Sequence, residues 1–265
     1  MTRPDYSDDL VLAHALADAA RAAILPYFRA DPAIDNKLDT GFDPVTAADR
    51  ASEEAMRRLL AEHRPEDGVL GEEFGETPGR SGRRWVLDPI DGTRAFIAGL
   101  PSWTVLIALE QAGRPCLGVI DQPHTGERFV GLPGSTQLHR ANGVTRLTTR
   151  RAVDLDRAIL SSTDPYLFAG QEAEAFASVR QAVQLCRYGF DAYAYAMLAA
   201  GHIDLVIESG LQIYDVQAFI PVIEGAGGVV TNWSGGDCSQ GGQVVAAGSH
   251  DLLEAALAHL KGAAL

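Results

Sequence analysis

The sequence predicts a mixed α/β protein in which an α+β half precedes an α/β half. The first quarter places apolar residues at helical spacing, and near residue 84 the pattern changes to short apolar runs typical of strands. After about residue 150, predicted strands and helices alternate along the chain. Strand runs followed by β-α alternation predict two abutting layered units.

The N-terminal quarter is predicted to be helical. Residues 8–29 form an alanine- and leucine-rich run, and segment 47–62 repeats alanine or leucine every four positions. This recurrence produces an apolar stripe along one face of a helix. Between the two helices, residues 37–44 indicate a loop or a hairpin.

Three short apolar runs predict an antiparallel ladder. They lie at 85–87, 103–109 and 116–120, and a turn signal at 111–114 separates the last two. The later part of the chain is predicted to form strands at 158–161, 203–207, 228–231 and 243–247, and helices at 171–185, 191–200, 215–225 and 250–261, the last capped by Ser249.

Composition excludes several classes of protein. The 265 residues carry 22 Lys and Arg against 35 Asp and Glu, a net charge of −13, which disfavours nucleic-acid binding because phosphate neutralisation needs cationic side chains. The 46% hydrophobic content is ordinary for a globular protein, and no run approaches the roughly 18 apolar residues of a membrane helix. The acidic N-terminus lacks the apolar segment of a signal peptide, and three widely spaced cysteines cannot close a disulfide framework. We therefore expect a cytoplasmic enzyme that binds neither nucleic acid nor membrane.

The most specific motif is the run DPIDGT at residues 88–93, directly after a predicted strand. Its proline prevents a continuous helix, so the segment is expected to turn at the strand end. The carboxylates of Asp88 and Asp91 can then converge beside the Ile90 carbonyl, and Gly92-Thr93 can open a helix whose N–H groups bind an anion. Hard oxygen ligands beside an anion site are typical of Mg²⁺-dependent phosphoryl chemistry. The alternative is a plain turn built from Asp and Gly.

Three further acidic elements are ambiguous by themselves. Glu72 lies in a Gly-Glu-Glu run after an apolar pair, which is also typical of a solvated loop. Asp49 follows Thr46 at capping-box spacing, so it indicates either a helix start or a functional acid. Asp215 opens an apolar helix and suits either an N-cap or a metal ligand.

In this order and spacing, the four elements resemble the inositol monophosphatase family. Its signature combines D-x-x-T-x-x-D, G-E-E, D-P-x-D-G-T and a late W-D before an apolar helix; here Tyr214 replaces the tryptophan. The resemblance covers the whole chain and implies the layered α-β-α-β-α sandwich of the sugar phosphatases, with Mg²⁺-dependent hydrolysis of phosphomonoesters. It implies a homodimer of single units spanning residues 1–265, in which 1–150 carry the metal and phosphate loops and 151–265 carry the substrate wall and the last metal ligand.

The resemblance also implies individual roles. Asp49 and Thr93 would orient the attacking water, with Glu72 as the base, and Gly92 and Thr93 would donate N–H groups to the phosphate. Lys37 matches the family's lysine near the loop. Direct attack by water implies that no phosphoenzyme forms. Two to three Mg²⁺ ions per active site would be held by Glu72, Asp88, the Ile90 carbonyl, Asp91 and Asp215.

One departure from the family pattern concerns the substrate. Asp191 stands where inositol phosphatases carry a small residue, and the runs around Arg187 and Glu208 resemble the histidinol-phosphate phosphatase branch. Histidinol phosphate carries an amine and an imidazole, which acids around its organic half would recognise. We therefore expect this small metabolite, an intermediate of histidine biosynthesis, as the substrate. The predicted substrate-binding residues are Ile90, Asp91, Gly92, Thr93, Arg187, Asp191, Glu208 and Asp215.

Several alternatives remain open on the sequence alone. The substrate could be an inositol 1-phosphate or a 3'(2'),5'-bisphosphate nucleotide. A catalytically silent relative that binds partners is a further alternative, although every acidic position of the pattern is filled. Asp191 could simply be the N-cap of the helix predicted at 191–200.

Overall fold

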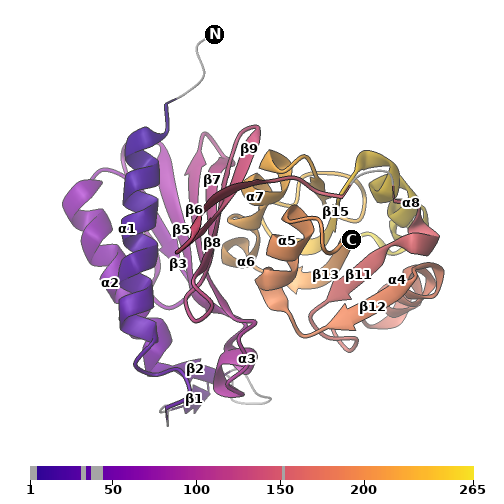
Figure 1. The fold of residues 1–265 in the computed structure, drawn as a ribbon, viewed down its shortest axis with the longest axis horizontal. Helices are drawn as coiled ribbons and strands as arrows, with labels where there is room; N and C mark the ends of the chain where they lie inside the picture. The colour runs from indigo at the N-terminus through magenta and orange to yellow at the C-terminus, as the bar shows by residue number, and fades with distance from the viewer. Residues whose placement is uncertain (1–4, 31–33, 37–43, 151–152) are drawn as a thin grey trace.

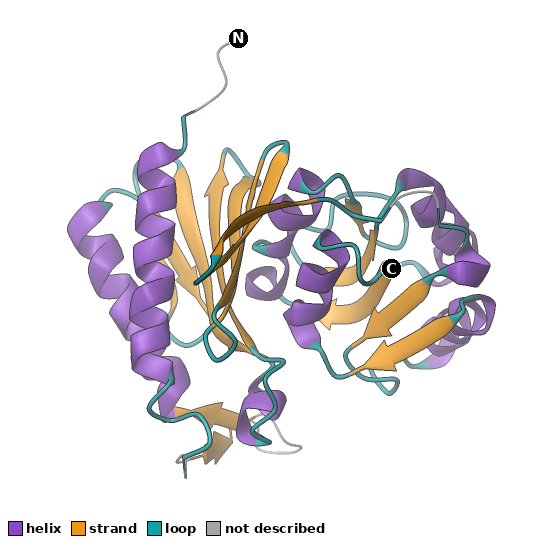
Figure 2. Cartoon of the chain, viewed as in Figure 1, coloured by secondary structure: helices purple, strands orange, loops and turns teal. Residues whose placement is uncertain are grey.

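Five layers, in the order α-β-α-β-α, make up the fold (Figure 1 and Figure 2). The structure is a computed structural model and describes residues 5–30, 34–36, 44–150 and 153–265. Two helices cover one face of an eight-stranded sheet, a middle layer of helices separates this sheet from a five-stranded one, and two more helices cover the far side (Figure 1). The predicted sandwich is confirmed.

The first outer layer consists of α1 (Ser7–Ile24) and α2 (Ala47–His63). Buried side chains such as Leu16 and Met56 pack with Trp85 of the sheet into one apolar cluster. The prediction that the first helix reaches residue 29 is wrong. Pro26 has no N–H to continue the helical ladder, and the chain continues in three-residue turns such as Tyr27 N to Ile24 O.

The eight-stranded sheet has the order β10-β9-β8-β7-β6-β5-β3-β4. The predicted antiparallel ladder is confirmed, because β5, β6 and β7 pair in that way, whereas β3 runs parallel to β5. A small hairpin of β1 (Ile34–Asn36) and β2 (Pro44–Thr46) flanks the undescribed residues 37–43. The strands are β3 (Gly68–Gly71), β4 (Gly75–Thr77), β5 (Arg83–Asp91), β6 (Thr104–Gln111), β7 (Arg114–Gln122), β8 (Glu127–Leu132), β9 (Ser135–Arg140) and β10 (Gly143–Leu147), and helix α3 (Thr93–Ile97) follows β5.

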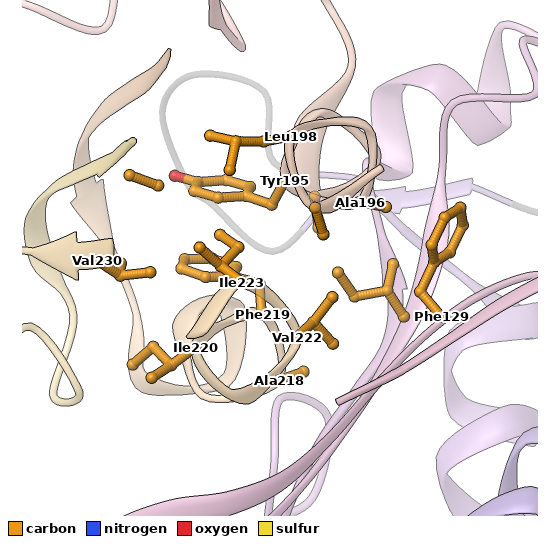
Figure 3. Close-up of a cluster of buried hydrophobic side chains, with 14 of the residues drawn as sticks. Phe129, Tyr195, Ala196, Leu198, Ala218, Phe219, Ile220, Val222, Ile223 and Val230 are labelled. Carbon is orange, nitrogen blue, oxygen red and sulfur yellow. The ribbon is translucent and has the colours of Figure 1, made fainter. Parts of the chain in front are cut away.

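The middle layer contains α5 (Asp191–Ala199), α6 (Ile213–Val216) and α7 (Phe219–Gly225). Figure 3 shows Phe129 of the first sheet on one side of these helices and Val230 of the second sheet on the other. Glycine is required where the sheet meets α7, because a β-carbon on Gly131 would lie 2.3 Å from the Val222 backbone. The helix predicted at 215–225 is interrupted by a turn after α6.

The five-stranded sheet has the order β12-β11-β13-β15-β14, with β12, β11 and β13 parallel. The predicted cap of the last helix is confirmed, since the Ser249 hydroxyl accepts a hydrogen bond from the Leu252 N–H. The prediction of one helix over 171–185 is wrong at its end. Helix α4 ends at Ala182, and the next residues form β12 by pairing with β11. The elements are β11 (Ile159–Ser162), α4 (Gly170–Ala182), β12 (Leu185–Tyr188), β13 (Leu205–Leu211), β14 (Val229–Thr231), β15 (Gly242–Ala247) and α8 (His250–Leu260), with 3₁₀ turns η1 (Leu155–Arg157) and η2 (Lys261–Ala263).

Helix lengths and compositions also bear on membrane association. Among the described residues, every helix is too short or too polar to span a bilayer.

The first sheet ends at Leu147 and the second begins at Ile159, so we keep the division of the unit near residue 150 as a proposal.

Candidate active site

The DPIDGT motif forms the end of β5 and the start of α3. Both acids lie within the last residues of the strand rather than after it, which corrects the predicted boundary. The register with β6 shifts between Asp88 and Asp91, where Pro89 cannot donate a ladder hydrogen bond. In a regular strand, residues three apart point to opposite faces of the sheet. The irregularity allows Asp88 and Asp91 to depart from this alternation.

Three carboxylates converge at this strand end. One oxygen each of Asp88, Asp91 and Asp215 lies within 4.8 Å of the others. Asp215 comes from α6, which packs against β5. It is not the N-cap of its helix: Gln212 is, and the Asp215 carboxylate accepts the Gln212 N–H at 2.6 Å. The Asp88 side chain is buried, and its Oδ1 has no hydrogen-bond partner.

The electrostatics of the three acids favour a bound cation. Burial, followed by the charges of Glu72, Asp91, Asp215 and Asp49, raises the pKa of Asp88 well above its ordinary value. Burial likewise raises the pKa of Asp215 to about 7. Three carboxylates at this separation repel one another unless a cation neutralises them. The donor set is all oxygen, and the unpartnered Asp88 oxygen lies within it, so these residues fit Mg²⁺.

Glu72 and Asp49 approach the same carboxylates from two other elements. Glu72 follows β3, and its N–H donates to the Leu87 carbonyl of β5 at 3.3 Å. Asp49 is buried in the first turn of α2. Both acids raise the pKa of Asp88, so both lie within electrostatic range of it, although neither belongs to the group within 4.8 Å. The capping-box interpretation depends on the side chain of Thr46, which lies outside the described residues.

Gly92 and Thr93 turn the chain from β5 into α3. Gly92 adopts φ = 82°, and a β-carbon there would lie 3.0 Å from an Asp191 oxygen, so glycine is required. The Thr93 hydroxyl donates to the Ile90 carbonyl at 3.1 Å. The roles predicted for the Ile90 carbonyl as a metal ligand and for the Gly92 and Thr93 N–H groups in phosphate binding stay predictions.

Asp191 lies beside the three clustered carboxylates and does not cap its helix. It follows the N-cap Phe190 and adopts a left-handed conformation, φ = 46°. The N–H of Ala192 instead donates to Asp91 Oδ2 at 2.6 Å. The alternative of a plain N-cap role for Asp191 is therefore wrong. Burial raises the pKa of Asp191 to about 6, against the opposing influence of Arg94.

Glu208 of β13 forms the other acid of the predicted substrate wall. It is 1% exposed, its Oε1 accepts the Thr163 N–H at 2.7 Å, and its Oε2 is buried without a hydrogen-bond partner. Burial raises the pKa of Glu208 to about 8. Thr163 could not be found from the sequence, because it reaches Glu208 through the pairing of the neighbouring strands β11 and β13.

The remaining predicted residues are less closely tied to the cluster. Arg187 is exposed on β12, and its guanidinium lies 5.8 Å from the centre of the Phe190 ring. Tyr214 lies in α6 next to Asp215 and is partly buried. Lys37 lies outside the described residues.

Comparison with known proteins agrees with this geometry. A bifunctional chloroplastic phosphatase of Arabidopsis thaliana is 43% identical over 94% of this chain and 73% of that protein. A histidinol-phosphatase of Streptomyces coelicolor is 36% identical over 88% and 89%. The solved structure of an inositol monophosphatase from Zymomonas mobilis superposes with a TM-score of 0.86 at 45% identity, covering 98% of this chain and all of that one. A model of the inositol monophosphatase family matches residues 5–263, and the chain therefore belongs to this family of metal-dependent phosphatases.

Proposed function

We propose that this protein is a Mg²⁺-dependent histidinol-phosphate phosphatase, which hydrolyses L-histidinol phosphate to L-histidinol and phosphate. The observation that carries the proposal is a pair of acids, Asp191 and Glu208, beside the three clustered carboxylates. Neither acid is needed to hold the metal. An acidic wall next to a phosphatase centre suits a substrate whose organic half is cationic.

The metal would be held by the oxygen donors at the end of β5 and their neighbours. When bound, Mg²⁺ lowers the pKa of a water and stabilises charge that develops on the phosphate and on the leaving oxygen. The proposed ligands, for two to three ions per site, are Glu72, Asp88, the Ile90 carbonyl, Asp91 and Asp215.

The chain's own residues would position the reactants. The Thr93 hydroxyl donates a hydrogen bond to the Ile90 carbonyl, so its oxygen is available to accept a hydrogen bond from the attacking water. Asp49 completes the pair that orients this water, and Glu72 takes its proton. The N–H groups of Gly92 and Thr93 would bind the phosphate at the start of α3.

Recognition of the organic half would depend on the acidic wall. The buried Oε2 of Glu208 has no partner, so a donor on the substrate would satisfy it. A cationic donor also lowers the raised pKa values of Asp191 and Glu208 towards their ordinary range. A hydrogen bond between an acid and a cation contributes about 1.5–3 kcal/mol, roughly ten- to 150-fold in specificity. Arg187, exposed and stacked over the Phe190 ring, would contact the substrate only at the outer edge of the wall.

An inositol phosphate is the second candidate substrate. A hydroxyl could also satisfy the unpartnered oxygen of Glu208, and the solved relative from Zymomonas mobilis is described as an inositol monophosphatase. A polyol has no positive charge, however, and would leave the repulsion between the two acids of the wall uncompensated. The homodimer and the cytoplasmic location stay predictions.

Two conservative substitutions test the substrate. Asp191→Asn and Glu208→Gln should each raise KM for histidinol phosphate about tenfold or more, while hydrolysis of p-nitrophenyl phosphate changes little. Glu254→Gln is a control, because Glu254 pairs with Lys261 at 3.9 Å on the outer helix α8, away from the wall. Equal losses on the amine-bearing and the amine-free substrate would refute the histidinol pocket.

A further inference from the structure

Glu53 is a buried acid close to the active site that the proposed mechanism does not use. It lies on α2, one turn after Asp49, and is fully buried. Its carboxylate accepts hydrogen bonds from the Glu73 N–H at 2.7 Å and from the Phe74 N–H at 3.3 Å. It also pairs with Arg57 Nε at 2.7 Å. Both hydrogen bonds to the neighbouring turn therefore come from backbone N–H groups directly after Glu72.

The chain before Glu72 is shaped to receive this carboxylate. A β-carbon on Gly71 would lie 1.9 Å from Glu53 Oε1, so only glycine lets the backbone come so close. Arg57 extends the contact, since it donates to the Thr77 hydroxyl at 3.1 Å and to the Gly75 carbonyl. One side chain of α2 thus packs against Gly71 before Glu72 and hydrogen-bonds the two residues after it.

A fully buried carboxylate costs free energy unless it is paired and hydrogen-bonded. Within the described part of the chain, Glu53 meets both conditions through this turn and Arg57. Residues four apart lie on one face of a helix, so α2 directs Asp49 and Glu53 to the same side. One helix therefore presents an acid to the Asp88 cluster and fixes the turn that presents Glu72 to it.

We propose that Glu53 is a positioning residue for the phosphatase reaction: it fixes the Gly71–Phe74 turn to α2, so that Glu72 and Asp49 keep their separation at the metal cluster. The inference rests on the proposed metal-dependent function. Groups that orient metal ligands typically change metal affinity or activity by about 10- to 100-fold when they are lost.

The test compares Glu53→Gln with Asp204→Asn. Asp204 is an equally buried carboxylate that pairs with Arg150 and accepts the Ile159 N–H at 2.7 Å, but it lies far from Glu72 in the sequence and directly precedes β13 of the five-stranded sheet. Mg²⁺ binding is measured by calorimetry, and kcat and KM for p-nitrophenyl phosphate are measured over a range of Mg²⁺ concentrations. We expect Glu53→Gln to weaken Mg²⁺ binding about 10- to 100-fold, with kcat partly restored at saturating Mg²⁺. Asp204→Asn should lower only the melting temperature.

The experiment distinguishes a failure of the proposed function from a failure of the positioning role of Glu53. A wild-type protein without Mg²⁺-dependent phosphatase activity would refute the proposed function. An active wild type whose Glu53→Gln variant binds Mg²⁺ as tightly as Asp204→Asn would overturn the positioning role. If Glu53→Gln does not fold, Arg57→Gln decides in the same assay: weakened Mg²⁺ binding supports the role, and unchanged binding overturns it.

Discussion

Replacing Asp88 by asparagine should stabilise the metal-free protein while it removes phosphatase activity. Asp88 is buried, its Oδ1 has no hydrogen-bond partner, and carboxylate oxygens of Asp91 and Asp215 lie within 4.8 Å. At an effective dielectric near 20, one such pair of charges repels by about 3 kcal/mol. The partial exposure of the other two acids makes this an upper value. At about 2–4 °C per kcal/mol, the melting temperature in EDTA should rise by at most roughly 6–12 °C.

The stabilisation of the Asp88→Asn variant relative to the wild type should increase with pH. The pKa of Asp88 is raised in the folded protein, so the stability associated with its protonated form is present at low pH and is lost as pH rises through the raised value. Asp215, whose pKa is about 7, also becomes charged as pH rises, so the repulsion within the cluster increases further. The variant should therefore gain more over the wild type at pH 8 than at pH 5.

Thermal unfolding with and without Mg²⁺ is the assay. A ligand at 100 times its Kd stabilises a folded protein by about 2.7 kcal/mol, so Mg²⁺ should raise the melting temperature of the wild type and reverse the order of the two proteins. Asp67→Asn is the control: its carboxylate accepts hydrogen bonds from Ser81 and Trp85, so the change should destabilise in both conditions. An Asp88→Asn variant that melts below the wild type in EDTA at pH 8 would refute the reasoning.

Two further predictions concern the nucleophile and the packing of the layers. Thr93→Ala and Asp49→Asn should each lower kcat much more than they change KM, and the double variant should lose far less than the product of the two, as steady-state kinetics can check; an effect of Asp49→Asn on thermal stability alone would favour a capping role. Gly131→Ala should destabilise by about 1–3 kcal/mol in chemical denaturation, because its methyl group would meet the Val222 backbone, whereas Gly262→Ala, with open space around it, should be neutral.

The elements that local sequence determines were predicted well. The proline and glycine of the 88–93 motif, the apolar stripe of α2 and the Ser249 cap all act within a few residues. Errors occurred where distant segments decide the structure. The β12 residues 185–188 form a strand only because β11 lies beside them, and a single sequence has no signal for that neighbour.

In the candidate site, too, local motifs were predicted and contacts between distant segments were not. The motifs identified Asp88, Asp91 and Asp215, which the fold brings together from β5 and α6. The position of Asp191 could not be inferred, because its helix begins on a hydrogen bond to Asp91, 100 residues earlier in the chain. Glu53 was missed for a related reason: its partners on the Gly71–Phe74 turn are backbone N–H groups, which leave no pattern in the sequence.

Phosphate release by the purified wild-type protein tests the central claim most directly. The substrates are L-histidinol phosphate, inositol 1-phosphate, a 3'(2'),5'-bisphosphate nucleotide and fructose 1,6-bisphosphate, each assayed with Mg²⁺ and with excess EDTA. We predict that release requires Mg²⁺ and that kcat/KM is highest for L-histidinol phosphate. Undiminished release in EDTA would contradict the metal cluster of Asp88, Asp91 and Asp215 as the catalytic centre, and a higher kcat/KM for inositol 1-phosphate would contradict the histidinol pocket.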